Sequence, residues 1–277
     1  MPSRSIVAAG AVAAACCALA VAPASAAPQT NSPVSEITPC PAGTAAEHPI
    51  LLIHGTGRTV EQSLGPTRQA LIDDGRCVYG VDYDSWGPVS ESVDLVTSVA
   101  DRILAVNGAA SLDLVGKSQG GLIARAVSLR FSDRPTNPID QVVAISGPQL
   151  GTGTAGSGGA GALLQAVPNL ATALLPQAVI DLTPDSPYIA TLNSGPLTAP
   201  GVRYTMIGSS YDELVSPAVA FIDASNVTNI LLQDGCPIDH AGHAAEATDP
   251  RTIDLTMHTL DPDRHPDIRC TANNNAI

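Results

Sequence analysis

Short apolar runs alternate along the chain with longer segments in which apolar residues recur at a helical spacing. Residues 49–53 form a continuous apolar run of the kind found in buried strands. A helical stripe over residues 92–106 consists of Val93, Val96, Val99, Ala100, Ile103 and Leu104. The same reasoning predicts further strands at 77–83, 112–115, 141–145, 203–207 and 229–233, and further helices at 62–74, 121–131 and 252–260.

This alternation predicts an α/β fold with a mostly parallel central sheet and helices on both faces. Residues 147–200 interrupt the rhythm, because a glycine-rich stretch over 147–161 leads into an apolar segment, 162–182, with little charge. We expect this insertion to lie over the functional site as a lid or apolar wall; the alternative is an ordinary packed helix pair. The expected substrate contacts in it are Leu163, Leu164, Val167, Leu170, Leu174 and Val179.

The first residues have the pattern of an export signal. Arg4 precedes an apolar run over 6–22, and the small residues Ala24-Ser25-Ala26 follow it. We expect cleavage after Ala26, which leaves residues 27–277 as a single secreted domain. An uncleaved membrane anchor and a lipoprotein signal at Cys16 or Cys17 are weaker interpretations, since the run is short and rich in alanine.

Composition narrows the choice of partners. The net charge is −13, and Lys and Arg are not clustered, which argues against nucleic acid as a partner. The mature chain keeps four cysteines, Cys40, Cys77, Cys236 and Cys270, which in an exported protein indicate two disulfides with three pairings open. There is no Cys-x-x-Cys motif, so the sequence does not support a zinc site or thiol-redox chemistry.

The motif Gly116-Lys117-Ser118-Gln119-Gly120 matches G-x-S-x-G and lies between a predicted strand and a predicted helix. At such a turn a serine hydroxyl projects from the backbone, and the flanking glycines let neighbouring chain segments approach closely. The sequence therefore predicts Ser118 as a nucleophile.

The sequence also contains the other groups that such a nucleophile needs. Backbone N–H groups of Gln119 and of Thr56, in the glycine-rich loop after the first strand, are the expected oxyanion hole. The acid should follow a strand beyond the insertion, where Asp212 is the first choice and Glu213 the second. The base should follow the last strand, where the residues alone do not separate His240 from His243.

At these motifs the chain resembles the small secreted bacterial lipases of the α/β-hydrolase superfamily, and also Candida antarctica lipase B. The resembling stretches are residues 49–57, 118–122, 211–217 and 238–242, in the same order along the chain. The resemblance implies an α/β-hydrolase fold with Ser118 as nucleophile, Asp212 as acid and no cofactor. It also implies the sequential disulfides Cys40–Cys77 and Cys236–Cys270.

For the base the resemblance gives two answers. The string Ile238-Asp239-His240-Ala241-Gly242 matches the fungal lipase at His240, whereas the spacing from Cys236 and to the closing helix fits the bacterial relatives at His243. We take His243 as the base, with His240 as the alternative.

These observations predict a secreted carboxylic-ester hydrolase, a lipase or esterase that acts through an acyl-enzyme. Its expected partner is a lipid or other apolar ester, with a transient contact at a lipid interface, and a monomer is expected. An acyltransferase with the same three residues and a non-catalytic secreted binding protein of the same fold are the alternatives.

Overall fold

A computed structural model describes residues 37–152 and 175–273. Six parallel strands form one sheet in the order β2-β1-β3-β4-β5-β6. The strands are β1 (Ala45–Ile53), β2 (Arg76–Val81), β3 (Leu112–Lys117), β4 (Ile139–Ile145), β5 (Arg203–Gly208) and β6 (Val227–Leu231). Because all six run the same way, the loops at their carboxyl ends gather at one edge of the sheet.

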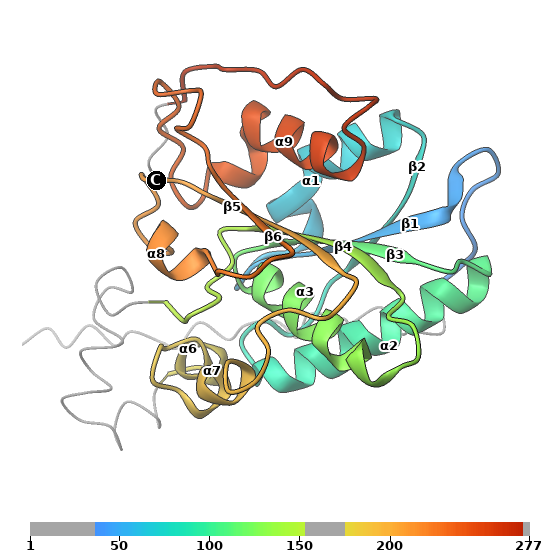
Figure 1. The fold of residues 1–277 in the computed structure, drawn as a ribbon, viewed down its shortest axis with the longest axis horizontal. Helices are drawn as coiled ribbons and strands as arrows, with labels where there is room; N and C mark the ends of the chain where they lie inside the picture. The colour runs from blue at the N-terminus through green and yellow to red at the C-terminus, as the bar shows by residue number, and fades with distance from the viewer. Residues whose placement is uncertain (1–36, 153–174, 274–277) are drawn as a thin grey trace, which may run out of the picture.

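Helices cover both faces of the sheet (Figure 1). Helices α1 (Val60–Asp73) and α9 (Pro250–Leu260) pack on one face, and α2 (Val89–Asn107) and α3 (Gln119–Arg130) pack on the other. The remaining helices are short and lie in the connections: η2 (Phe131–Asp133), α6 (Gln177–Asp181), α7 (Pro187–Leu192), α8 (Pro217–Ala220) and η3 (Glu246–Thr248).

Alternate residues of the strands supply two separate cores. In β1, Leu51 and Ile53 belong to the core under α2 and α3, while Ile50 and Leu52 belong to the core under α1 and α9. All four side chains are fully buried. A strand that is buried on both faces needs a continuous apolar run, and this explains why residues 49–53 lack alternation.

The fold agrees closely with the pattern in the sequence. Each predicted strand and helix is present, with ends displaced by a few residues. The disulfides Cys40–Cys77 and Cys236–Cys270 have the sequential pairing that the resemblance implied. Of the insertion, the structure describes α6 and α7, whereas the expected substrate contacts from Leu163 to Leu174 lie outside the described residues. Within the described ranges, no helix combines the length and apolar character needed to cross a membrane.

Candidate active site

The candidate catalytic residues meet at the carboxyl edge of the sheet. Ser118 follows β3, Asp212 lies in the loop after β5, and His243 lies in the long connection between β6 and α9. Parallel strands β3, β4 and β5 are neighbours, so side chains at their ends converge although they are far apart in sequence.

Ser118 occupies a tight turn between β3 and α3. Its backbone has a φ of 53° and a ψ of −125°, a conformation that residues with a side chain rarely adopt. A Cβ on Gly116 would lie 2.2 Å from the carbonyl oxygen of Gly120, and a Cβ on Gly120 would lie 2.1 Å from that of Ile53. Both motif glycines are therefore required by close backbone contacts, which hold the serine in its strained position.

Ser118, His243 and Asp212 form a hydrogen-bonded chain. The Oγ atom of Ser118 lies 2.9 Å from Nε2 of His243, and Nδ1 of that ring lies 2.7 Å from Oδ2 of Asp212. The other carboxylate oxygen, Oδ1 of Asp212, accepts hydrogen bonds from the backbone N–H groups of Leu214 and Val215. This is the arrangement in which an oriented imidazole can take a proton from a serine hydroxyl.

The alternative residues of the sequence analysis point elsewhere. The ring of His240 stacks at 4.2 Å on Tyr211, and its backbone N–H donates to the carbonyl of Asn273. Glu213 is exposed, and its carboxylate accepts from the backbone N–H of His243 rather than from the ring. The structure thus brings His243 and Asp212, not His240 and Glu213, to Ser118.

Burial and neighbouring charges shift the pKa values of Asp212 and His243. Burial tends to raise the pKa of Asp212, but the hydrogen bond from His243 and the charge of Lys117 more than offset it, so this pKa lies below its usual value. Burial and the charge of Lys117 lower the pKa of His243, and the opposing influence of Asp212 and Glu213 is smaller. The imidazole therefore favours its neutral form, the form that a general base requires.

The two residues expected at the oxyanion hole lie side by side. Gln119 is the first residue of α3, where a backbone N–H has no acceptor within the helix. The hydroxyl of Thr56 donates to Oε1 of Gln119 at 2.7 Å, which ties the loop after β1 to the start of α3. Since this hydroxyl is engaged, the backbone N–H of Thr56 is the group left to face a substrate.

A cavity of about 520 Å³ opens above Ser118. Val179 and Leu182, from the described part of the insertion, form part of its wall together with Leu214 and Val215. The remaining lining residues are Gly55, Thr56, Arg58, Gln62, Ser63, Lys117, Ser118, Thr152, Glu213, His243, Ala244 and Ala247. Val179 is thus the one expected substrate contact among the described residues, and it does line the cavity.

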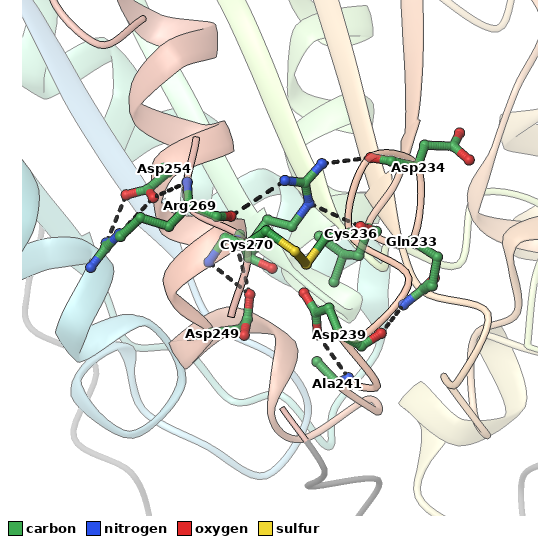
Figure 2. The surroundings of a disulfide bond; sticks show 12 residues. Gln233, Asp234, Cys236, Asp239, Ala241, Asp249, Asp254, Arg269 and Cys270 are labelled. Carbon is green, nitrogen blue, oxygen red and sulfur yellow. Dashed lines mark hydrogen bonds and ion pairs between the residues drawn. A yellow bond between two sulfur atoms is a disulfide. The ribbon is translucent and has the colours of Figure 1, made fainter. Parts of the chain in front are cut away.

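The loop that carries His243 begins beside the second disulfide, Cys236–Cys270, whose surroundings Figure 2 shows. Near Cys236, the side-chain amide of Gln233 donates to the carbonyl of Asp239, and the buried carboxylate of Asp239 accepts from the N–H of Ala241. The guanidinium of Arg251 donates to the carbonyls of Leu232 and Asp234. These bonds fix an irregular segment that is not part of the sheet.

Sequence reasoning missed a buried ion pair next to the site. The Nζ atom of Lys117 lies 2.7 Å from Oε2 of Glu246, and the hydroxyl of Ser146 donates to the same oxygen. The sequence shows Lys117 only as a residue of the serine motif, and nothing in it points to Glu246 as its partner. The one signal in the sequence is the position of a lysine directly before the motif serine.

Asp212, His243 and Glu246 also bring possible metal-ligand atoms to within 4.8 Å of one another. Asp212 and His243 are bonded to each other, however, and Glu246 pairs with Lys117. A divalent cation in this cluster would face the ammonium group of Lys117, so the donor set suits a hydrogen-bond network better than a metal.

Comparison with known proteins gives one family match. A model of the palmitoyl protein thioesterase family matches residues 49–180, which include β1, the serine turn and β4. No curated protein sequence matches the chain.

Several solved structures share the fold. Aspergillus fumigatus lipase B is 22% identical with a TM-score of 0.61, over 81% of this chain and 57% of that one, so the chain spans little more than half of that lipase. Bacillus licheniformis lipase BlEst2 in its mature form is 13% identical with a TM-score of 0.57, over 81% and 94% of the two chains. MGS-MChE2, an α/β hydrolase enzyme from a sediment metagenome of the lagoon of Mar Chica in Morocco, is 15% identical with a TM-score of 0.52, over 78% and 91%. The likeness confirms the predicted α/β-hydrolase fold.

Proposed function

We propose that this chain is a serine ester hydrolase, a lipase or carboxylesterase in which Ser118, His243 and Asp212 are the nucleophile, base and acid. The observation that carries the proposal is the hydrogen-bonded chain from Ser118 Oγ through the His243 ring to Asp212. It stands at the strained strand-to-helix turn where an α/β-hydrolase presents its nucleophile.

The reaction follows from the positions of these atoms. Nε2 of His243 takes the hydroxyl proton as Oγ of Ser118 attacks the ester carbonyl, and Asp212 stabilises the imidazolium that results. The negative oxygen of the tetrahedral intermediate accepts hydrogen bonds from the backbone N–H groups of Thr56 and Gln119. His243 then returns the proton to the leaving alcohol, which leaves an acyl group on Ser118. Water, deprotonated by His243, releases the carboxylic acid and restores the serine.

The cavity supports an apolar acyl group as the preferred substrate part. Val179 and Leu182 face the site from the insertion, and Leu214 and Val215 face it from the loop after Asp212. An alkyl chain laid against these side chains gains roughly 25 cal/mol for each Å² of apolar surface removed from water. A lipid ester, reached at a transient contact with a lipid interface, is therefore the proposed substrate class, with no cofactor and with a monomeric enzyme.

A thioester is the second candidate substrate, and the match of residues 49–180 to the palmitoyl protein thioesterase family favours it. The same residues serve both reactions, because an acyl thioester differs from an ester only in its leaving group. A thiolate leaves more readily than an alkoxide, so protonation by His243 matters less for a thioester. The ratio of kcat/KM for an acyl thioester to that for the matched oxygen ester in the wild type distinguishes the two substrate classes.

We further propose that the protein is secreted as a single domain, residues 27–277, after removal of residues 1–26. Two disulfides support an oxidising location. Edman sequencing or mass spectrometry of the protein from a culture medium tests the cleavage after Ala26. Recovery of the uncleaved chain in the membrane fraction would contradict it.

The function is tested with p-nitrophenyl butyrate and p-nitrophenyl palmitate, using the wild type, Ser118→Ala, His243→Ala and His240→Ala. We expect Ser118→Ala and His243→Ala to lower kcat by about a thousandfold or more, as loss of such residues does elsewhere. His240→Ala is the matched control and should keep most of the activity, because its ring packs on Tyr211.

Two other outcomes of these assays would favour the alternative functions. Absence of turnover in the wild type, with no labelling of Ser118 by a phosphonate, would favour the non-catalytic binding protein. An excess of transesterified product over free acid, in the presence of a competing alcohol, would favour the acyltransferase.

A further inference from the structure

A buried ion pair lies directly behind the proposed triad. Lys117 and Glu246 are joined at 2.7 Å, and their side chains are 5% and 0% exposed. The hydroxyl of Ser146, which follows β4 and is also fully buried, donates to the same carboxylate oxygen. The other oxygen, Oε1 of Glu246, is buried with no hydrogen-bond partner among the described residues. Such a pair is costly to bury, so its presence at this place needs a reason.

The pair joins the two segments whose relative position matters most for the reaction. Lys117 immediately precedes Ser118, at the end of β3. Glu246 follows His243 by three residues, and its backbone N–H donates to the carbonyl of Gly242 at 3.1 Å. One side-chain contact therefore connects the nucleophile turn to the histidine loop, across 129 residues of sequence.

We propose that Lys117 and Glu246 are positioning residues of the proposed hydrolase: their ion pair sets the distance between Ser118 and His243, and the ammonium group of Lys117 keeps the imidazole neutral. This inference rests on the proposed function, since it gives the pair a role in the same reaction. Neither residue touches the reacting atoms; both act through His243 and Ser118.

The charges around His243 support the proposed action of Lys117 on the imidazole. Asp212, Glu213 and Glu246 are the acidic groups near the imidazole, and the ligand atoms of Asp212, His243 and Glu246 lie within 4.8 Å of one another. Lys117 is the basic group that acts on the ring, and Arg58 lines the same cavity ahead of α1. Burial is the largest cause that lowers the pKa of His243, and the charge of Lys117 is the next. Burial raises the pKa of Glu246 to about 7 against the influence of Lys117. Protonation of Glu246 below neutral pH weakens the ion pair and leaves the positive charge of Lys117 less compensated.

Stability alone does not account for the pair. Replacing both members of a buried ion pair with neutral side chains of similar volume is often neutral or stabilising, because two charges no longer have to be desolvated. A pair kept only for stability would be expected to be dispensable in this way. A pair kept for catalysis would not, since the neutral replacement loses the charge that acts on His243.

The test measures kcat/KM for p-nitrophenyl butyrate from pH 5 to pH 9 in the wild type, Lys117→Met, Glu246→Gln and the double variant. Loss of the ammonium group should move the acid limb of the profile to higher pH, so the ratio of kcat/KM at pH 6 to that at pH 8 should fall by about threefold or more in Lys117→Met. Glu246→Gln keeps the lysine charge and imitates the protonated acid, so its acid limb should not move upward.

The double variant separates the catalytic role from a structural one. It leaves no lone buried charge, so its free energy of unfolding should return close to the wild-type value even if Lys117→Met alone folds poorly. The acid limb of its pH profile should nevertheless lie at higher pH than in the wild type, because the lysine charge is still missing. A double variant whose profile coincides with that of the wild type would overturn the inference.

A second readout does not depend on turnover. The NMR titration of the His243 ring, assigned by its absence in His243→Gln, should shift to higher pH in Lys117→Met and in the double variant. If the wild type shows no turnover that depends on Ser118, the proposed function fails and this role fails with it. If that turnover is present but neither the profile nor the titration moves with Lys117, this inference alone fails.

Discussion

The two disulfides allow stability and activity to be separated by matched deletions. One pair of variants is Cys40→Ala/Cys77→Ala and the other is Cys236→Ala/Cys270→Ala. The bridges close sequence separations of 37 and 34 residues, which are nearly equal. In the chain-entropy account the cost of losing a bridge depends on that separation, so each loss should lower the free energy of unfolding by about 4 kcal/mol.

The effects on activity should differ because the bridges lie in different surroundings. Cys77 is near the start of β2, at the edge of the sheet opposite the site, and β1 is held between β2 and β3 whether or not the bridge is present. Cys236 and Cys270 enclose α9 and the irregular segment that carries His243, and this segment contributes no strand to the described sheet. We expect kcat to fall by about tenfold to a hundredfold without the second bridge, through a displaced imidazole, and to change little without the first.

Urea unfolding at 25 °C gives the two stability losses, and hydrolysis of p-nitrophenyl butyrate under native conditions gives kcat for each variant. The expected result is an equal decrease in unfolding free energy with unequal kcat. Equal losses of kcat, or a larger loss without Cys40–Cys77, would refute the reasoning that the second bridge positions His243.

Two further predictions concern buried positions in the serine turn and near the start of β3. Gly120→Ala places a Cβ 2.1 Å from the carbonyl oxygen of Ile53, so it should abolish ester hydrolysis and lower the unfolding free energy by about 3 kcal/mol. Gly195→Ala is the neutral control in the same assays, because a Cβ at Gly195 has nothing within 4 Å. Burial raises the pKa of Asp113 to about 7, above its value in the unfolded chain, so wild-type stability should fall as the pH rises from about 4 to about 7. Asp113→Asn cannot ionise and should therefore be more stable than the wild type at pH 8, by up to about 4 kcal/mol, but not at pH 4; denaturant unfolding with the same advantage at both pH values would contradict this.

Elements were predictable from the sequence wherever a local rule determines them. Strands such as β1 contain a continuous apolar run, and α2 has one apolar stripe and ends at Gly108, whose backbone is left-handed. The errors are at the boundaries. β3 continues to Lys117 because Gly116 and Lys117 still pair with β4, and α1 begins at Val60 because Thr59 caps it. The spacing of apolar residues carries no information about strand partners or helix caps, and these determine where the elements begin and end.

The site was predictable only in part, for a physical reason. Ser118 is identified by a local turn motif, but His240 and His243 share a loop without a period, and their ring directions depend on distant contacts. Tyr211 holds one ring away, and Asp212 orients the other. The partner of Lys117 could not be inferred at all, because Glu246 is brought to it only by the whole fold.

The central claim is that His243 activates Ser118. The most direct measurement is the rate at which an alkyl p-nitrophenyl phosphonate labels the protein, followed by intact mass and located by peptide mapping. The account predicts a single label on Ser118 in the wild type and in His240→Ala, and labelling slower by several orders of magnitude in His243→Ala. A label on another residue, or an equal rate in His243→Ala and the wild type, would contradict it.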